Sequence, residues 1–467
     1  MYYKLNKHIF IRKINNKLFL ENKLTEEIIH GDNIAYIFLK YLSYTPQHIN
    51  IILNNIISEF DSATVDKNEI REDLIQFLIP FIDSSIVAYG LTELDCNKNE
   101  TKFSYKNIKL NNYNLEQKDT SETLIEIAKE NSSNPQLIYV MLEITKYCNE
   151  RCLHCYIPHE NKNIILTDEN FYKIIDECKK LETVCAFRIS GGECMTHPSF
   201  KKYIKYIKDN GFGLTVLTNL TLLDDEIISI LQEGTLSDVQ VSLFSLDEKI
   251  HDKITTIPGS LKKTLMNLEK LYNADIPVAI ATQAMELNKN CINDIFKYAQ
   301  EHNFKMNFDW TIVGKEDTST DNLDLRIQDL SNYSDICETK SKYNLDFKDK
   351  FKEDFSLPKN PEKFLCNAGI NGLHITPNLK VTPCPGWNLY LGDLNFSSLQ
   401  EVWETSSELK RIRQIRLKDF IECSNCDKSN VCNICMAQAY NENNGKFEIS
   451  DYVCKMYDVI KKTILDY

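Results

Sequence analysis

The chain has 467 residues, 43% of them apolar and 26% charged, which is the balance of a soluble globular protein of about three domains. Its net charge of −13 argues against DNA or RNA as the main partner. No apolar run approaches the roughly 18 residues of a membrane helix, and the N-terminus lacks a secretory signal, so we expect a cytoplasmic protein with no membrane partner. In that reducing compartment the 16 cysteines are expected to bind metals or clusters rather than form disulfides.

Residues 1–92 contain no cysteine and are predicted to form a small module in which strands precede three helices. The predicted elements are a hairpin over 9–20 that turns at Asn15 and Asn16, a third strand within 24–30, and helices over 34–42, 49–60 and 70–81. Thr45 and Pro46 have the residue types of an N-cap and a first helical turn, and we expect them to open the second helix. This order of elements is typical of a winged-helix-like domain.

A polar bridging segment over 93–133, with one predicted helix at 121–130, leads into residues 134–315, where apolar runs alternate with helical stretches. The runs, each a predicted strand, span 137–144, 186–189, 214–217, 239–243 and 278–281, and the helices span 168–181, 199–210, 224–233 and 260–273. This alternation indicates an α/β fold with a parallel sheet, whose chemistry lies at the carboxyl ends of the strands. Residues 316–360 form a second polar bridging segment. In the tail, 361–467, we expect clusters rather than a hydrophobic core to organise the backbone.

A first group of cysteines, Cys148, Cys152 and Cys155, follows the first predicted strand of this sheet. Three thiolates within eight residues can hold three irons of a cubane, or can bind zinc together with a ligand from elsewhere. The spacing alone leaves both possibilities open.

The next strands also end in polar residues. Gly191, Gly192 and Glu193 follow the second strand, where two glycines let the backbone approach a ligand and a carboxylate can bind an amine. Asn219 follows the third strand, and Ser242 ends the fourth.

These motifs resemble those of the radical S-adenosylmethionine (SAM) superfamily, which has CX3CX2C after the first strand and GGE after the second. The resemblance implies a partial (β/α)6, TIM-like barrel in which Cys148, Cys152 and Cys155 bind a [4Fe–4S] cluster. It also implies that SAM binds the fourth iron through its amino and carboxylate groups. One electron, from a flavodoxin or ferredoxin-type donor, then cleaves SAM to a 5′-deoxyadenosyl radical that abstracts hydrogen.

The same resemblance implies how SAM is held: Gly191, Gly192 and Glu193 bind its methionine moiety, while Ser242, with Asn219, contacts the ribose. Cys194 departs from the family pattern, which usually has proline after GGE. Its side chain is either a small buried residue or a hydrogen donor in the reaction.

The tail carries seven further cysteines. Its spacing, with Leu391–Leu394 and Glu401–Trp403 after the second of them, resembles the SPASM extension, which holds two auxiliary [4Fe–4S] clusters; zinc ribbons are the alternative. The resemblance assigns Cys423, Cys426, Cys432 and Cys454 to a distal cluster and Cys366, Cys384 and Cys435 to a proximal one. Leu379 departs from the usual glycine of this extension.

The proximal cluster then has three protein ligands. One iron is either open to a substrate thiolate, the soft ligand it favours, or filled by another residue such as Cys337. The open iron predicts a thioether product, from a peptide cysteine sulfur to a carbon of another residue. Pro385 stands where sulfatase-activating relatives carry a catalytic aspartate, which disfavours that activity.

The N-terminal module resembles the leader-binding element of peptide-modifying enzymes. A DNA-binding winged helix is the alternative, but residues 1–95 hold 9 Lys and Arg against 13 Asp and Glu, a balance of −4. A peptide added as a strand beside the third strand, flanked by the 66–83 helix, suits this charge better.

We therefore predict a radical SAM enzyme with three [4Fe–4S] clusters that forms thioether crosslinks in a ribosomally made precursor peptide. Carbon–carbon or carbon–oxygen crosslinking and epimerisation are alternative reactions. A zinc-rich scaffold is the non-enzymatic alternative.

Overall fold

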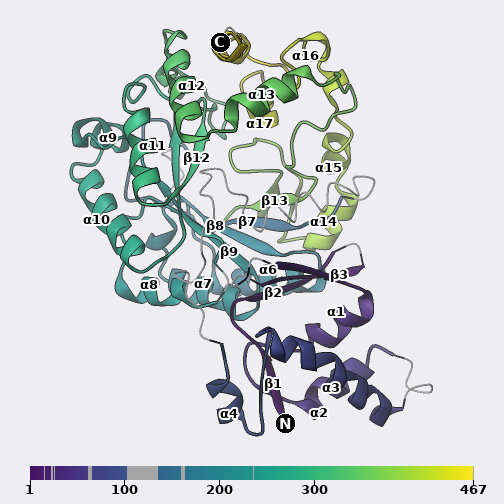
Figure 1. The fold of residues 1–467 in the computed structure, drawn as a ribbon. Helices are drawn as coiled ribbons and strands as arrows, with labels where there is room; N and C mark the ends of the chain where they lie inside the picture. The colour runs from purple at the N-terminus through teal and green to yellow at the C-terminus, as the bar shows by residue number, and fades with distance from the viewer. Residues whose placement is uncertain are drawn as a thin grey trace.

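The computed structural model describes residues 1–14, 16–22, 25, 27–60, 66–101, 135–158, 163–234 and 236–465. Asn15 and the helix predicted at 121–130 lie outside these residues. The described chain forms an N-terminal domain, a barrel of parallel strands and a C-terminal part, with the first and last at opposite ends of the molecule (Figure 1). None of the described helices combines the length and apolar character needed to cross a bilayer.

Six parallel strands form the barrel. They are β7 (Tyr139–Glu143), β8 (Ala186–Ser190), β9 (Gly213–Thr218), β10 (Asp238–Ser242), β11 (Val278–Gln283) and β12 (Lys305–Asp309). They lie in chain order, and every neighbouring pair is parallel. The predicted α/β fold with a partial (β/α)6 barrel is confirmed. The sequence did not predict β12, because this edge strand alternates polar and apolar residues instead of forming an apolar run.

Helices cover the outer face of the barrel (Figure 1). They are α6 (Asp168–Lys180), α7 (Phe200–Asp209), α8 (Asp225–Gln232), α9 (Glu248–Thr255), α10 (Ser260–Asn273) and α11 (Ile292–Glu301). Sequence predicted four of them to within two residues. In α6 the buried side chains recur at helical spacing, at Phe171, Ile174, Ile175 and Cys178, and the Thr167 side chain caps its first turn.

The C-terminal part continues the barrel sheet on the other side of β7. β13 (Gly372–Ile375) pairs with β7 in parallel, and β14 (Lys380–Thr382) and β15 (Gly392–Asp393) follow in antiparallel pairing. Its helices are α12 (Asn332–Tyr343), α13 (Phe347–Ser356), α14 (Leu399–Thr405), α15 (Ser407–Ile412), α16 (Ile421–Asn425), α17 (Met436–Asn441) and α18 (Asp451–Leu465).

A single hydrophobic core extends from Leu137 to Ile464 and so includes the tail. The expectation that clusters rather than a core organise this tail was wrong. The amphipathic helix α18 buries Met456, Tyr457 and Ile460 in the same core as the barrel strands.

The described residues of the N-terminal domain form two antiparallel sheets and four helices. One sheet consists of β2 (Ile9–Ile14), β3 (Lys17–Asn22) and β4 (Glu27–Gly31), and the other of β5 (Gln47–His48), β1 (Tyr2–Leu5) and β6 (Val87–Gly90). The helices are α1 (Asn33–Lys40), α2 (Ile49–Ile57), α3 (Lys67–Asp83) and α4 (Glu93–Lys98). The predicted hairpin, third strand and three helices are present. The sheet of β5, β1 and β6 was not foreseen.

The prediction that Thr45 and Pro46 open α2 was wrong. Instead, His48 caps this helix, and its side chain accepts a hydrogen bond from the amide of Asn50. The chain stays extended beyond Pro46 because Gln47 and His48 pair with β1.

Candidate functional site

Cys148, Cys152 and Cys155, the radical-site cysteines, lie in the loop after β7, at the carboxyl end of the barrel. Burial, together with the charges of Glu150, Cys155 and Cys148, raises the pKa of the Cys152 thiol well above its usual range. The amide of Glu150 donates a hydrogen bond to the sulfur of Cys148 over 3.4 Å. The three thiols therefore act on one another electrostatically, and a bound metal would be needed to hold them deprotonated.

Gly191 and Gly192 bring the end of β8 against the cysteine loop. A Cβ added to Gly191 would lie 2.5 Å from the carbonyl oxygen of Thr145, and one added to Gly192 would lie 2.4 Å from that of Tyr147. The amides of Gly192 and Glu193 donate to these same carbonyls over 2.7 and 2.8 Å. The glycines thus allow a close backbone approach to the cysteine loop as well as to any ligand.

Glu193 is buried, and protein groups bind its carboxylate. Oε1 accepts hydrogen bonds from the amide of Met195 over 2.9 Å and from the hydroxyl of Thr218 over 2.7 Å, and Oε2 accepts one from the amide of Asn219 over 2.6 Å. The thiol of Cys194 also donates to Oε1 over 3.7 Å, so the acceptor position that remains is on Oε2. The side chain ties β8 to β9.

Asn219 and Ser242 lie at the same end of the barrel. The amide of the Asn219 side chain donates to Oδ1 of Asn149, in the cysteine loop, over 2.9 Å. Ser242 is half-buried at the end of β10. The structure thus brings the predicted SAM-binding residues to the edge of the sheet that carries the radical-site cysteines.

Cys366, Cys384 and Cys435, the proximal cysteines, come together from separate segments of the tail. Burial, and then the charges of Cys366 and Cys435, raise the pKa of Cys384 well above its usual range. Cys435 is exposed as a whole residue, but protein surrounds its thiol. This burial raises the pKa of the thiol to about 11. The amide of Ala368 donates to the sulfur of Cys366 over 3.4 Å.

Tyr156 lies near both the radical-site and the proximal cysteines. Burial is the main cause that raises the pKa of its hydroxyl, and the charges of Cys155 and Cys384 both add to this effect. Its ring contacts the turn at Gly386, where an added Cβ would lie 3.1 Å from the ring. One cysteine of each group therefore lies near the same tyrosine.

Cys423, Cys426, Cys432 and Cys454, the distal cysteines, form the third group. Burial, followed by the charges of the other three thiols, raises the pKa of Cys432 to about 12. The amide of Lys428 donates to the sulfur of Cys426 over 3.4 Å.

The donor set of the three groups fits iron–sulfur clusters. In each group the amide two residues beyond a cysteine donates to its sulfur, the kind of hydrogen bond that tunes cluster thiolates. Within the described ranges, no three Cys, His, Asp or Glu side chains are placed to hold a single metal ion. A zinc site needs its sulfur ligands at about 2.3 Å from one point, whereas a cubane spreads them over separate irons.

Sequence reasoning missed polar side chains that end other strands of the barrel. They are Glu143 on β7, Ser190 on β8, Gln283 on β11 and Asp309 on β12. Successive side chains along a strand point to opposite faces of the sheet. The residues that precede three of these polar groups, Leu142, Ile189 and Phe308, pack in or against the main core. The polar groups therefore face the barrel interior. Glu143 Oε1, Ser190 Oγ and Gln283 Oε1 are buried without a hydrogen-bond partner in the described part of the chain.

Glu143 lies beside another buried polar side chain, that of His374 on β13. Glu143 Oε2 lies 3.7 Å from Nε2 of His374, and the two side chains are 1% and 2% exposed. Burial raises the pKa of Glu143 to about 8 and lowers that of His374 to about 3. Both groups are therefore held neutral at pH 7. A carboxylate inside the apolar run of β7 was the available sequence signal.

Two of the remaining cysteines were given possible roles from sequence. Cys194 is fully buried in the main core, where its thiol donates to the carbonyl of Leu217 over 3.2 Å. Cys337 is buried on α12 in the same core; burial raises its pKa to about 12, and Glu338, Lys348 and Lys340 are the charged groups that act on it. Both thiols are therefore packed in the main core, and the roles predicted for them stay predictions.

The fold and the cysteine groups define a radical SAM enzyme with an additional cluster-binding domain. Residues 142–299 match the radical SAM superfamily, and residues 366–427 match the SPASM iron–sulfur cluster-binding domain. The chain therefore contains a radical SAM domain and a SPASM domain.

Curated relatives include proteins with different activities. The chain is 25% identical over 320 residues to the AdoMet-dependent heme synthase of Methanosarcina barkeri, covering 64% of this chain and 90% of that protein. It is 24% identical over 321 residues to the subtilosin biosynthesis protein AlbA of Bacillus subtilis, covering 66% and 69%.

Among solved structures, SuiB of Streptococcus suis bound to the precursor peptide SuiA has a similar fold. It aligns with a TM-score of 0.60 at 15% identity, covering 97% of this chain and 100% of SuiB. The similarity extends across the N-terminal domain, the barrel and the tail.

Proposed function

We propose that this enzyme forms thioether crosslinks in a ribosomally made precursor peptide, from a cysteine sulfur to a carbon of another residue. The observation that carries the proposal is the group of three proximal cysteines, Cys366, Cys384 and Cys435, which meets the radical-site cysteines near Tyr156. Three thiolates leave one iron of a cubane without a protein cysteine. A soft thiolate is the ligand that such an iron prefers.

The residues at the carboxyl end of the barrel fit SAM and its cluster. Cys148, Cys152 and Cys155 would hold the cluster, and the free acceptor position of Glu193 would bind the amino group of SAM. When bound, SAM and the cluster supply the abstraction of a hydrogen atom from a carbon of the peptide. The chain itself binds, orients and excludes water. A flavodoxin or ferredoxin-type protein would supply the electron.

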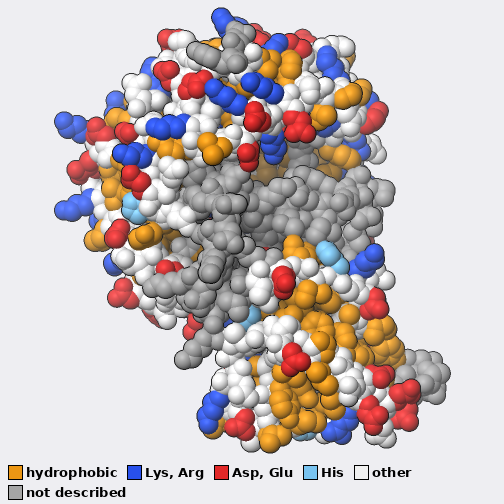
Figure 2. All heavy atoms as spheres, viewed as in Figure 1, with side chains coloured by type: hydrophobic (Ala, Val, Ile, Leu, Met, Phe, Trp, Pro, Cys, Tyr) orange, Lys and Arg blue, Asp and Glu red, His pale blue; other side chains and the backbone are white. Residues whose placement is uncertain are grey.

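We assign the leader of the precursor to the N-terminal domain, at the edge of β4. β4 pairs only with β3 among the described strands, so one edge offers free backbone groups. Ile28 on β4, Ile34 on α1 and Ile79 on α3 are exposed. Figure 2 shows hydrophobic side chains gathered on the surface of this domain, in the lower part of the view. AlbA is named as a bacteriocin biosynthesis protein, and SuiB is bound to a precursor peptide, SuiA. Both names support a peptide substrate.

Mass spectrometry of the modified precursor tests the reaction. Each thioether removes one hydrogen from a thiol and one from a carbon, so each crosslink lowers the mass by two hydrogens. Replacing a core cysteine of the precursor by serine should abolish one such loss. A cysteine-free precursor that is still dehydrogenated would indicate carbon–carbon or carbon–oxygen crosslinking, and an unchanged mass with inverted stereochemistry would indicate epimerisation.

A further inference from the structure

The N-terminal domain is docked at the amino-terminal ends of the barrel strands. Arg12 on β2 is half-buried, and its Nε donates to the carbonyl of Val184, just before β8, over 3.0 Å. Its guanidinium also hydrogen-bonds the carbonyl of Gly211 and lies 4.5 Å from the ring centre of Phe212, both just before β9. One side chain therefore joins this domain to the starts of two barrel strands.

Apolar contacts seal the same junction. Phe10 on β2 and Phe19 on β3 form a buried cluster with Ile138, which precedes β7, and Cys185, which precedes β8. Their aromatic rings contact each other edge to face, with centres 6.4 Å apart. All four side chains are at most 1% exposed. The sheet of β2 and β3 is thus part of the packed interior and not a loosely tethered module.

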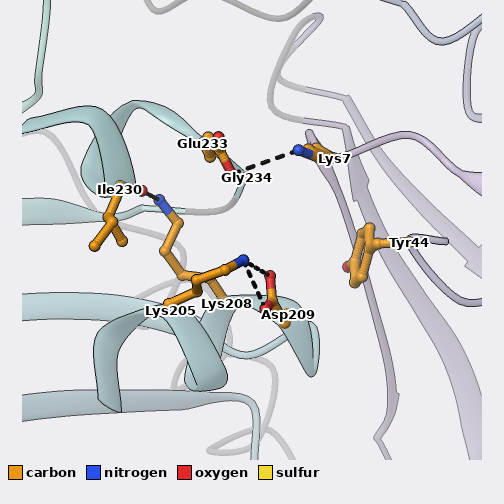
Figure 3. A pocket seen from close by; sticks show the side chains of 8 residues that line it. All are labelled: Lys7, Tyr44, Lys205, Lys208, Asp209, Ile230, Glu233 and Gly234. Atoms are coloured by element: carbon orange, nitrogen blue, oxygen red, sulfur yellow. Dashed lines mark hydrogen bonds and ion pairs between the residues drawn. The ribbon is translucent and has the colours of Figure 1, made fainter. Parts of the chain in front are cut away.

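Charged groups line the rim of this junction (Figure 3). Lys7 forms an ion pair with Glu233, at the end of α8, over 3.5 Å. Beside it the buried Lys208 donates to the carbonyl of Ile230 over 2.6 Å, and the ring of Tyr44 faces this group from the N-terminal domain. The cavity between them has a volume of only about 30 Å³.

The reaction site lies at the opposite ends of the same strands. The radical-site cysteines follow β7, and Gly191, Gly192 and Glu193 follow β8. β7 has five residues and β9 has six, and strands rise about 3.3 Å per residue, so about 17–20 Å of barrel separates the two ends. β4 lies next to β3 in the sheet whose phenylalanines, Phe10 and Phe19, make this contact with the barrel.

We propose that the substrate is a precursor in which a spacer of at least about five residues separates the leader segment docked on β4 from the first crosslinked residue. An extended peptide advances at most about 3.6 Å per residue, so fewer residues cannot pass along the barrel. This inference rests on the proposed function. The packed junction fixes the leader at one end of the barrel, and the spacer decides which core residues reach the other end.

The test is a series of precursors with the leader and core unchanged and the spacer cut to zero, two or four residues, or extended by five Gly-Ser residues. A precursor with a scrambled spacer of native length is the matched control. The intact holoenzyme should bind all of them with dissociation constants within twofold, measured by fluorescence anisotropy. Crosslinking, followed by the loss of hydrogen pairs, should fall at least tenfold with zero or two residues. Crosslinking of the precursors with extended or scrambled spacers should stay within a few-fold of that of the native precursor. The reason is that the effective concentration of the core at the reaction site falls slowly with linker length.

Two results would contradict the proposed need for a spacer. Equal crosslinking without any spacer would show that the N-terminal domain leaves its position on the barrel and carries the leader to the reaction site. Loss of binding on shortening would show that the segment is part of the leader site. Absence of crosslinks in the native precursor would instead overturn the proposed function itself, so the two failures are distinguishable.

Discussion

The backbone amide of Gly192 donates a hydrogen bond to the carbonyl oxygen of Thr145 over 2.7 Å. This contact joins the loop after β8, which follows the GGE pattern, to the loop that carries Cys148. The GGE motif and the loop of the radical-site cysteines are thus hydrogen-bonded to each other at the carboxyl ends of two adjacent parallel strands.

Replacing Gly192 by alanine should separate these loops. The added Cβ would lie 2.4 Å from the carbonyl oxygen of Tyr147, a backbone atom that cannot rotate away, so we expect a loss of about 1–3 kcal/mol of stability and weaker SAM binding. Urea unfolding and equilibrium dialysis with SAM measure the two effects. Gly314→Ala is the control, because its Cβ would meet a side-chain carbon of Glu442 at 3.3 Å and no backbone atom nearer than 3.5 Å. Equal behaviour of the two variants would contradict the close approach.

Replacing Cys148, Cys152 or Cys155 by alanine should abolish cleavage of SAM. Each variant removes one of three thiolates, and the cluster that would bind SAM is no longer held. The formation of 5′-deoxyadenosine, measured by chromatography under reducing and anaerobic conditions, reports the outcome. Cys291→Ala, at the half-buried start of α11, should retain cleavage. Cleavage that persists in any of the three variants would refute their assignment.

Charge on the exposed apolar face of the N-terminal domain should weaken precursor binding. Deleting residues 1–92 is a poor test, because it would expose the barrel side of the cluster around Phe10 and Phe19. Ile28→Asp and Ile79→Asp, at side chains 38% and 43% exposed, avoid this problem and should raise the dissociation constant at least fivefold. Leu345→Asp, at an 85% exposed side chain in the C-terminal part, should leave binding unchanged. Binding that survives both isoleucine changes would place the leader elsewhere.

Glu143→Gln should change how stability depends on pH. Burial raises the pKa of Glu143 in the folded chain to about 8, above its value in the unfolded chain, so the folded state binds more protons between about pH 4.5 and 8. The stability of the wild type should therefore fall as pH rises through this window, by at most about 1.4 kcal/mol per pH unit from this group. Glutamine cannot ionise and should remove that slope in urea unfolding at pH 5 to 8. The exposed Glu269→Gln is the control, and parallel curves for all three proteins would show that Glu143 is not held neutral.

Apolar runs were sufficient to predict five of the six barrel strands, because parallel strands covered by helices are apolar along their length. The sixth, β12, lies at the edge of the sheet and exposes Asn307 and Asp309, so it has no such run. The pairing of β1 with β5 and β6 joins segments more than 40 and 80 residues apart, which periodicity within one segment does not reveal.

Sequence spacing predicted three groups of cysteines, and the members of each group act on one another electrostatically in the structure. The neutral pair of Glu143 and His374 was not predictable, since it depends on β13 joining β7 across more than 200 residues. The use of three acceptor positions of Glu193 by Met195, Thr218 and Asn219 also appears only in three dimensions.

Counting iron and acid-labile sulfide in anaerobically purified protein tests the central claim most directly, which is that ten cysteines form three separate clusters. The wild type should hold about 12 irons and 12 sulfides per chain, four for each cluster. Replacing all cysteines of one group by alanine should leave about eight irons and eight sulfides per chain. The three groups are Cys148, Cys152 and Cys155; Cys366, Cys384 and Cys435; and Cys423, Cys426, Cys432 and Cys454. Stoichiometric zinc without sulfide, or the loss of a second cluster's iron when one group is replaced in a chain that remains folded, would contradict it.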